Sequence, residues 1–433
     1  MPYTFRRVYW SSGGAFVFAT AAAAVGLGNI WRFPYLAGEN GGGAFIIAYI
    51  FAVLCFGVPL MILEISAGRA ERGSPVRTFR RILKRAAPAG WLVVILTFII
   101  MSYYLVITGW TLGFTVESFK GEDLPSFSEF VSGYASLWYF LIVAGITAFV
   151  VAHGVKMIEW LSKLMMPALI AVILLLTVYS LTLEGRGEAL SFLFNPNFSD
   201  FLDPTLWLLA FGQAFYSLAV GQGYLITYGS FMKKGINLPR STAWVAGIET
   251  SVALIAGLML FPLVFTFGLD PAEGTELAFT TLPLAFDSIP FGGILSILFF
   301  SLFFLAAISS CIAGMQVIKT TIREEFGFSP KRATFVSFIT LLPLGVLAAL
   351  SFTPVELSFL GRPFLEILDM FAANQIVVTS GVVGGAIISW SISKPDLVDG
   401  FGTRWTRLAH TTITVVRYLP ILVSVLLILV WLF

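Results

Sequence analysis

Charged residues, cysteine and histidine are scarce in this sequence. Only 12% of its 433 residues are charged, and there are two cysteines and two histidines. Cys55 and Cys311 both lie inside apolar runs, which excludes a disulfide framework. His153 and His410 lie in or near loop segments without a cluster of metal-ligating side chains, so a membrane enzyme is the least favoured class. A cleavable signal pattern is not expected either, because the apolar run after Arg7 continues unbroken.

Apolar residues take the place of the missing charges. The chain is 58% hydrophobic, its mean hydropathy is +0.91, and runs long enough to cross a bilayer recur along it. This pattern predicts an all-α polytopic membrane protein with a single transmembrane domain over residues 1–433. Eleven spans are predicted, at Ala15–Leu36, Gly43–Leu63, Trp91–Phe114, Ser136–Val151, Leu164–Leu183, Leu206–Phe231, Trp244–Phe267, Gly292–Ile318, Ala333–Ala349, Ile367–Trp390 and Thr412–Phe433.

Basic residues fall almost entirely on one side of these spans. Of the 26 lysines and arginines, only Lys120, Arg186 and Arg362 lie in the opposite loops, and Arg32 lies within a span. The positive-inside rule therefore predicts a plasma-membrane (inner-membrane) protein with a cytoplasmic N-terminus, and eleven spans put the C-terminus outside. The dense basic loop after the second span is interpreted as a topology signal rather than a nucleic-acid patch.

The first span carries polar residues where a membrane helix rarely has them. Gly26, Gly28 and Asn29 lie in its middle, and Arg32 follows one turn later. Glycine weakens a helix, and Asn and Arg at membrane depth are costly unless they face protein, water or a ligand. The pattern predicts a helix broken over residues 24–28, which frees carbonyls for a cation and N–H groups for an anion. A kinked helix with small residues for packing is the alternative.

The sixth span repeats this anomaly. Gly221 and Gly223 flank Gln222 in the middle of an apolar run. Spans one and six open successive groups of five, and an odd group size inverts the second group relative to the first. Two interrupted helices at matching positions of inverted halves are typical of a secondary transporter with its site between the breaks. The predicted halves are residues 1–183 and 202–391, with an extra helix at 404–433.

Further polar side chains lie within predicted spans. Glu249 is a membrane carboxylate, which must be either neutral or close to something positive. Tyr104 lies too deep for an interfacial aromatic belt. Ser309 and Ser310 form a pair whose ordinary alternative is hydrogen bonding to the preceding helical turn. Glu64 ends the second predicted span.

Several long motifs resemble the neurotransmitter:sodium symporter family, in its prokaryotic amino-acid branch. They are A-V-G-L-G-N-I-W-R-F-P in span one, E-N-G-G-G-A-F at 39–45, Y-Y with T-G-W-T-L-G-F in span three, G-Q-A-F-Y-S-L in span six and S-S-C-I-A-G-M-Q in span eight. The resemblance covers nearly the whole chain. It implies the same five-plus-five inverted-repeat fold with broken helices 1 and 6, and eleven spans occur among bacterial members.

The resemblance implies two sodium sites made only of oxygen ligands, as suits a hard cation. The first would use the Ala24 carbonyl, the side chains of Asn29, Ser217 and Glu249, and the substrate carboxylate. The second would use the carbonyls of Ala22, Val25 and Ala306 and the hydroxyls of Ser309 and Ser310.

The resemblance also implies the substrate contacts. The substrate carboxylate would meet the Leu27 and Gly28 N–H groups and the Tyr104 hydroxyl, and its ammonium group the carbonyls of Ala24, Phe215 and Ser217. The side chain would lie among Ile100, Tyr104, Tyr216, Ala219, Gln222, Ser310 and Gly314.

One position of the family pattern bears on the substrate class. The monoamine branch has Asp where this chain has Gly26. Glycine leaves room for a substrate that brings its own carboxylate, which favours an α-amino acid over an amine. Gln222 and Gly314 replace larger or more apolar family residues, so we expect a wider pocket, more polar on one wall, for a large hydrophobic or aromatic amino acid.

Two gates follow from the resemblance. The outer gate would pair Arg32 with Asp369, helped by Gln213 over a lid of Tyr104 and Tyr216. The inner gate would pair Arg7 with Glu324 beneath Trp10. Single ion pairs of this kind open and close at modest cost.

Glu249 departs from the family pattern, in which many members have Asn. Chloride-dependent members hold chloride at positions that are here Tyr49, Gln213, Ser217, Glu249 and Ala253, and Ala253 replaces their serine ligand. Glu249 would then supply the negative charge permanently, so that no chloride is required, because a dry site that holds sodium ions needs a compensating anion. Proton antiport is possible instead if Glu249 takes up a proton during the cycle.

Three other functions remain to be weighed against a sodium-coupled amino-acid symporter. A sodium-dependent sensor on the same fold is expected to carry a large soluble signalling extension, which this sequence does not contain. A channel fits poorly with two gates around a closed site, and an amine transporter fits poorly with Gly26. The expected partners are a small amino acid and the lipid bilayer, with no nucleic acid and no obligate protein partner.

Overall fold

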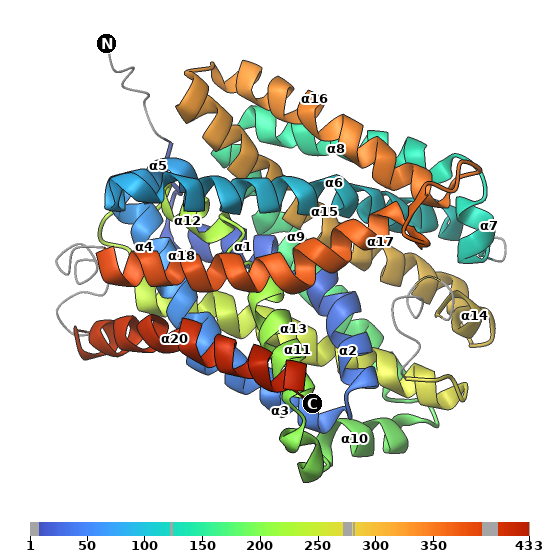
Figure 1. Ribbon diagram of the computed structural model, residues 1–433. Helices are drawn as coiled ribbons and strands as arrows, with labels where there is room; N and C mark the ends of the chain where they lie inside the picture. Colours follow the sequence, from blue (N-terminus) through green and yellow to red (C-terminus); the bar gives the residue numbers. More distant parts are fainter. Residues whose placement is uncertain (1–7, 122–123, 272–278, 280–281, 392–405, 433) are drawn as a thin grey trace.

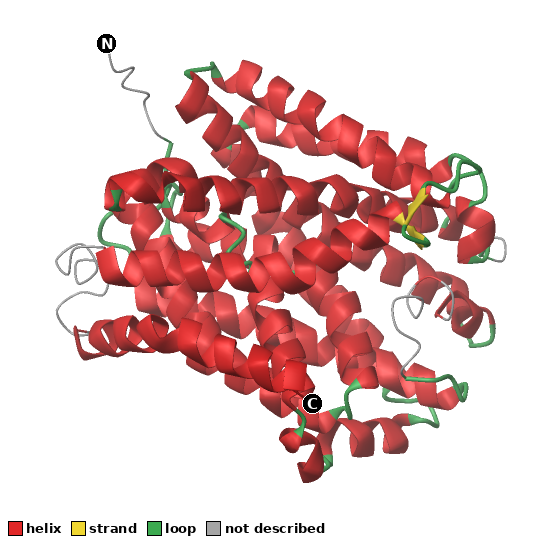
Figure 2. Ribbon diagram, viewed as in Figure 1, coloured by secondary structure: helices red, strands yellow, loops and turns green. Residues whose placement is uncertain are grey.

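The computed structural model describes residues 8–121, 124–271, 279, 282–391 and 406–432, and these are almost entirely helical (Figure 2). The strands found in this part of the chain are β1 (Ser358–Phe359) and β2 (Arg362–Pro363), which form a short antiparallel hairpin before α17. The fold is therefore a bundle of helices, as the sequence predicts (Figure 1).

Within the described residues, eight continuous helical segments are long and apolar enough to cross a membrane. They are α3–α4 (Gly43–Ala52 and Val58–Glu71), α6 (Ala87–Ser118) with the turn before it, α8 (Ala135–His153), α9 (Val155–Ser180), α13 (Leu238–Thr266), α15 (Gly292–Phe326), α16 (Pro330–Ala349) and α17–α18 (Phe364–Asp369 and Val377–Ser391). The bent pair formed by α1 (Gly13–Ala24) and the segment Gly28–Glu39, which includes α2 (Phe33–Glu39), makes a ninth.

The remaining two predicted spans also fall on helices. The sixth is α11 (Pro204–Ser217) followed by α12 (Tyr224–Gly229), and the eleventh is α20 (Thr406–Leu432). The shorter helices are α5 (Pro75–Ile82), α7 (Phe127–Val131), α10 (Arg186–Phe194) and α14 (Leu282–Asp287). Several helices run beyond their predicted ends, α15 to Phe326 for example, because hydropathy marks the apolar part of a helix and not its polar extension.

Both predicted helix breaks are confirmed. The two arms of the first helix meet at an angle of 55°, and Val25 at the junction has an extended backbone. The second break runs from Leu218 to Gly223, with left-handed backbone at Ala219, Gly221 and Gly223. Glycine adopts that conformation without strain, and a Cβ on Gly221 would come within 2.5 Å of the Gly381 amide nitrogen in α18.

The arrangement places both breaks inside the bundle. α6 and α15 pack along each other through the middle of the molecule, while α8 and α16 lie together on its outer side (Figure 1). Large side chains on these outer helices are exposed, among them Trp138, Phe149 and Phe335. Apolar surface of this extent matches contact with lipid rather than water. α3 packs on α11 and α4 on α12, so the second span supports both arms of the broken sixth.

Candidate functional site

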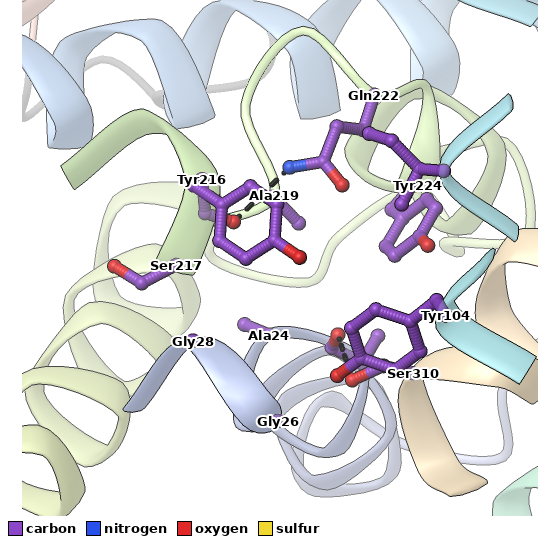
Figure 3. A pocket seen from close by; sticks show the side chains of 12 residues that line it. Ala24, Gly26, Gly28, Tyr104, Tyr216, Ser217, Ala219, Gln222, Tyr224 and Ser310 are labelled. Carbon is purple, nitrogen blue, oxygen red and sulfur yellow. Dashed lines mark hydrogen bonds between the residues drawn. The ribbon is translucent and has the colours of Figure 1, made fainter. Parts of the chain in front are cut away.

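The two breaks enclose a cavity between α1, α6, α11, α12 and α15 (Figure 3). Its lining residues come from both breaks and from the two central helices, and are Ala23, Ala24, Gly26, Gly28, Ile100, Tyr104, Tyr216, Ser217, Ala219, Gln222, Tyr224 and Ser310. Pockets between the helices of a bundle are a common place for small-molecule sites.

Most of the predicted substrate residues line this cavity, and three do not. Leu27 contributes its backbone N–H, which donates to the Tyr104 hydroxyl at 2.9 Å. Phe215 is fully buried outside the lining. Gly314 also lies behind the wall: a Cβ there would meet the Met101 sulfur at 2.3 Å and the Tyr224 hydroxyl at 2.7 Å. Met101 and Tyr224 therefore fill the space that Gly314 was expected to open, and the predicted widening at Gly314 is wrong.

Gly26 lies where the first break meets the cavity. A Cβ on this residue would come within 2.5 Å of both the Ser310 and the Tyr104 side-chain oxygens. The Gly26 N–H donates to the Asn29 side-chain oxygen at 3.1 Å, which closes the turn. The position therefore accommodates glycine alone, and the nearby polar groups are backbone N–H groups and hydroxyls.

A buried carboxylate joins the first break to α11. Glu249 accepts hydrogen bonds from the Asn29 amide at 2.6 Å and from the Tyr49 hydroxyl at 3.1 Å, and the Tyr49 oxygen is 3.2 Å from the Ser217 hydroxyl. All four side chains are almost completely buried. Asn29, Ser217 and Glu249, predicted from separate spans, are thus gathered at one place that is rich in oxygen atoms.

The serine pair of α15 faces the carbonyls of α1. The Ser309 hydroxyl lies 2.6 Å from the Ala22 carbonyl oxygen and 2.8 Å from that of Ala306. The Ser310 hydroxyl donates to the Ala23 carbonyl at 3.1 Å. Serine hydroxyls were expected to bond either to their own preceding turn or across the site, and Ser309 does both.

Among the predicted outer-gate residues, Arg32 contacts Gln213 and Tyr216. The Arg32 guanidinium donates to the Gln213 side-chain oxygen at 2.7 Å and lies 5.2 Å from the centre of the Tyr216 ring. The Gln213 amide donates to the Gly28 carbonyl at 2.7 Å. Asp369 lies in electrostatic range of Arg32. Arg32 directly precedes α2, and Asp369 is the last residue of α17.

The inner gate is described in part, because Arg7 lies outside the described residues. Trp10 is fully buried and donates from its ring to the Tyr228 carbonyl at 2.9 Å. Glu324 accepts the Ser74 N–H at 2.7 Å and is 4.0 Å from Arg77. Glu324 thus ties the loop before α5 to the end of α15.

Sequence reasoning missed Ala23 and Tyr224 as lining residues and did not assign Glu64 a role. Tyr224 begins α12, two residues after Gln222, so its closeness to the break was a usable signal. Glu64 accepts the Gly221 N–H at 2.8 Å, while the Ser380 hydroxyl donates to the Gly221 carbonyl at 2.7 Å. Both polar groups of the Gly221 backbone are therefore satisfied where the helix is interrupted.

Comparison with solved structures agrees with this geometry. The fold matches the crystal structure of MhsT in complex with L-phenylalanine with a TM-score of 0.89, 32% sequence identity and coverage of 98% of this chain and 100% of that one.

Comparison of sequences gives relatives over most of the chain. The uncharacterized sodium-dependent transporter YhdH of Bacillus subtilis is 36% identical over 407 residues, which cover 91% of this chain and 90% of that protein. The sodium- and chloride-dependent taurine transporter of Rattus norvegicus is 25% identical over 455 residues, covering 91% and 73%. Residues 7–129 and 131–432 match the sodium:neurotransmitter symporter family. The chain therefore belongs to that family of sodium-dependent transporters.

Proposed function

We propose that this protein is a sodium-coupled symporter of an α-amino acid with a large hydrophobic or aromatic side chain, working by alternating access. The observation that carries the proposal is the absence of a side chain at Gly26, where none would fit. A side chain there would collide with the Ser310 and Tyr104 oxygens, so the protein supplies no carboxylate at this point of the cavity. A zwitterionic substrate would bring its own.

The first break is suited to receive that carboxylate. The Leu27 and Gly28 N–H groups begin the helical arm after the break, and the N-terminus of a helix favours a negative group. The Tyr104 hydroxyl, now 2.9 Å from the Leu27 nitrogen, is the further donor at the same place. The carbonyls of Ala24, Phe215 and Ser217 would receive the ammonium group.

Two sodium ions are the coupling partners in this proposal. The oxygen atoms of Ala24, Asn29, Ser217 and Glu249 would hold the first ion together with the substrate carboxylate. Those of Ala22, Val25, Ala306, Ser309 and Ser310 would hold the second. The Ser309 hydroxyl already lies beside the Ala22 and Ala306 carbonyl oxygens, which supports the second set, because neutral oxygen atoms gathered in this way are ligands that a hard cation prefers and the hydroxyl would keep its proton.

Transport without chloride is part of the proposal. Chloride-dependent relatives such as the rat taurine transporter are named for that requirement. Here the Glu249 carboxylate contacts Asn29 and Tyr49 directly, and Ala253 beside it on α13 is fully buried and offers no hydroxyl. A permanent negative charge at this place would balance the sodium ions without an added anion.

Opening and closing would proceed at the two gates in turn. On the outer side, the Arg32, Gln213 and Tyr216 contacts would separate to admit substrate, with Asp369 as the partner of Arg32. On the inner side, Trp10 would leave the carbonyl of Tyr228, with the proposed pair of Arg7 and Glu324. The terms outer and inner follow the predicted orientation, in which the N-terminus lies in the cytoplasm and the C-terminus outside the plasma membrane.

Uptake into proteoliposomes tests the proposal. A panel of labelled L-amino acids is offered with sodium or with potassium outside. Sodium-stimulated accumulation of a subset supports symport and names the substrate. Saturable sodium-dependent binding without accumulation would indicate a sensor instead. No response to any amino acid would overturn the Gly26 argument, and amines would be tested next.

A further inference from the structure

The wall of the cavity opposite the first break carries a fixed hydrogen-bond acceptor. The Gln222 side-chain nitrogen donates to the Tyr216 backbone carbonyl at 3.0 Å. A carbonyl can only accept, so the atom facing it must be the amide nitrogen, and this settles which way the amide is turned. The Gln222 side-chain oxygen then points into the cavity (Figure 3).

The Gln222 backbone is held as firmly as its side chain. The Thr97 hydroxyl on α6 donates to the Gln222 carbonyl at 2.5 Å. Gly221 before it is bound through Glu64 and Ser380. Gln222 is only 4% exposed, so its amide cannot turn outward to water without breaking the contact with Tyr216. Across the described residues, no side chain or backbone N–H donates to the Gln222 side-chain oxygen.

Tyr224 places a hydroxyl at the same end of the cavity (Figure 3). This hydroxyl is 3.9 Å from the Met101 sulfur, a contact much weaker than an ordinary hydrogen bond to oxygen or nitrogen. The residue is 5% exposed. Its hydroxyl is therefore available to hydrogen-bond a ligand atom, either as donor or as acceptor.

The surfaces beside these two groups are apolar. Ile100 from α6 and Ala219 from the second break line the cavity, and Tyr216 adds an aromatic ring. A flat ring fits such surfaces, but a purely hydrocarbon ring would leave the Gln222 oxygen buried without a donor. An unpaired buried acceptor is costly, whereas a ligand with a matching N–H or O–H pays no such penalty.

We propose that Gln222 and Tyr224 select an amino acid whose aromatic side chain carries a hydrogen-bond donor, an indole N–H or a phenol O–H. The proposal rests on the proposed function above, since it takes the substrate to be an amino acid anchored at the first break. It narrows that class from hydrophobic and aromatic side chains in general to those of tryptophan and tyrosine.

Paired analogues test the inference without mutation. Tryptophan is compared with 3-benzothienylalanine, in which sulfur replaces the indole N–H at nearly the same size, and tyrosine is compared with phenylalanine. Competition against labelled substrate in sodium gives the ratio of apparent affinities within each pair. We expect the donor-bearing member to bind about tenfold more tightly.

A substitution then locates the effect. Gln222→Leu keeps the size of the side chain and removes the acceptor, so both ratios are expected to fall to near one, with phenylalanine and 3-benzothienylalanine gaining affinity. Gln316→Leu is the matched control, because Gln316 is equally buried, bonds within its own helix to Thr320 and lies outside the cavity, and it should leave both ratios unchanged. The ratio of apparent affinities within each pair does not depend on the fraction of the protein that folds, because both ligands compete for the same folded molecules.

The outcomes separate the two proposals. Amino-acid binding with ratios near one in the unmodified protein would overturn the selection by Gln222 and leave amino-acid symport standing. The same holds if Gln222→Leu keeps ratios near ten. Failure to bind any amino acid in sodium would overturn the proposed function itself. If Gln222→Leu does not fold, the analogue ratios in the unmodified protein still decide.

Discussion

The two helix breaks differ in how they are held. The first, at Val25–Leu27, is held by residues that belong to the site itself: Asn29 accepts the Gly26 N–H and Tyr104 accepts that of Leu27. The second, at Leu218–Gly223, is held from outside the cavity by Glu64, Thr97 and Ser380.

This difference separates two tasks. The first break presents backbone groups and hydroxyls, which suit the charged ends common to all amino acids. The second presents side chains, Gln222 and Tyr224, which can vary without disturbing the supports behind them. Under the proposed function, recognition of the substrate carboxylate would thus fall to the first break and selection of the side chain to the second.

The largest effect is expected at Glu249. This residue joins the first break to α11, through Asn29 on one side and through Tyr49 and Ser217 on the other. The double change E249N and A253S removes the built-in charge and supplies a serine ligand for chloride. In chloride-free buffer, uptake should fall about 100-fold or more, because removing one member of a buried charged cluster costs ~3–5 kcal/mol. Added chloride should restore it. The unmodified protein should transport equally well in chloride and in gluconate, and equal chloride-free uptake by the double variant would contradict the charge argument.

The next effect tests the first break alone. Gly26→Ala places a Cβ within 2.5 Å of two side-chain oxygens, and overpacking of this kind costs about 1–3 kcal/mol. Apparent substrate affinity should therefore fall about tenfold to 100-fold. The control is Gly212→Ala on α11, where a Cβ would meet nothing within 4 Å. Equal affinities of the two variants in a sodium-dependent binding assay would rule out a crowded Gly26.

Glu64 tests the second break in the same way. Glu64→Ala leaves the buried Gly221 N–H without an acceptor, which costs about 1–3 kcal/mol. Thermal unfolding in detergent should shift to lower temperature, and substrate affinity should fall by a smaller factor than for Gly26→Ala. Glu64→Gln keeps an acceptor oxygen and should recover most of the unfolding temperature and most of the substrate affinity. No recovery with Gln would mean that the negative charge of Glu64 matters, not its hydrogen bond.

The smallest effect is expected at Trp10, on the side that the positive-inside rule predicts to face the cytoplasm. Trp10→Phe keeps an aromatic ring against Tyr228 and Phe231 but removes the N–H that donates to the Tyr228 carbonyl. Loss of one such bond costs about 0.5–1.5 kcal/mol. The population open to the cytoplasm should rise severalfold, measured as faster labelling of a cysteine placed on the cytoplasmic half of α1. Unchanged labelling would show that Trp10 does not hold this side closed.

Hydropathy and glycine placement predicted the architecture well. Membrane spans follow from long apolar runs, because every span must be apolar outside and must satisfy its backbone hydrogen bonds within itself, wherever it lies in the chain. The break at 24–28 was predicted because Gly26, Gly28 and Asn29 oppose a continuous helix locally. Glu249 was identified because a carboxylate in an apolar span needs a partner. These are local statements, and the structure confirms the breaks and pairs Glu249 with Asn29 and Tyr49.

The details of the cavity wall could not be predicted in the same way. Gly314 predicted added space, yet Met101 from α6 and Tyr224 from α12 occupy it. Whether a glycine leaves a hole depends on side chains from helices far apart in the sequence, since protein interiors are packed to high density. The direction of the Gln222 amide likewise depends on the Tyr216 carbonyl across the turn.

The sequence by itself determined the membrane helices, their two interruptions and the inventory of buried polar groups, because these follow from the cost of placing glycine, Asn, Arg and Glu in an apolar segment. Only the tertiary structure decided which of those groups share a cavity. It brought Gln222 and Tyr224 to one end and the Gly26 turn to the other, because their distances are set by how α1, α6, α12 and α15 pack together and not by spacing along the chain.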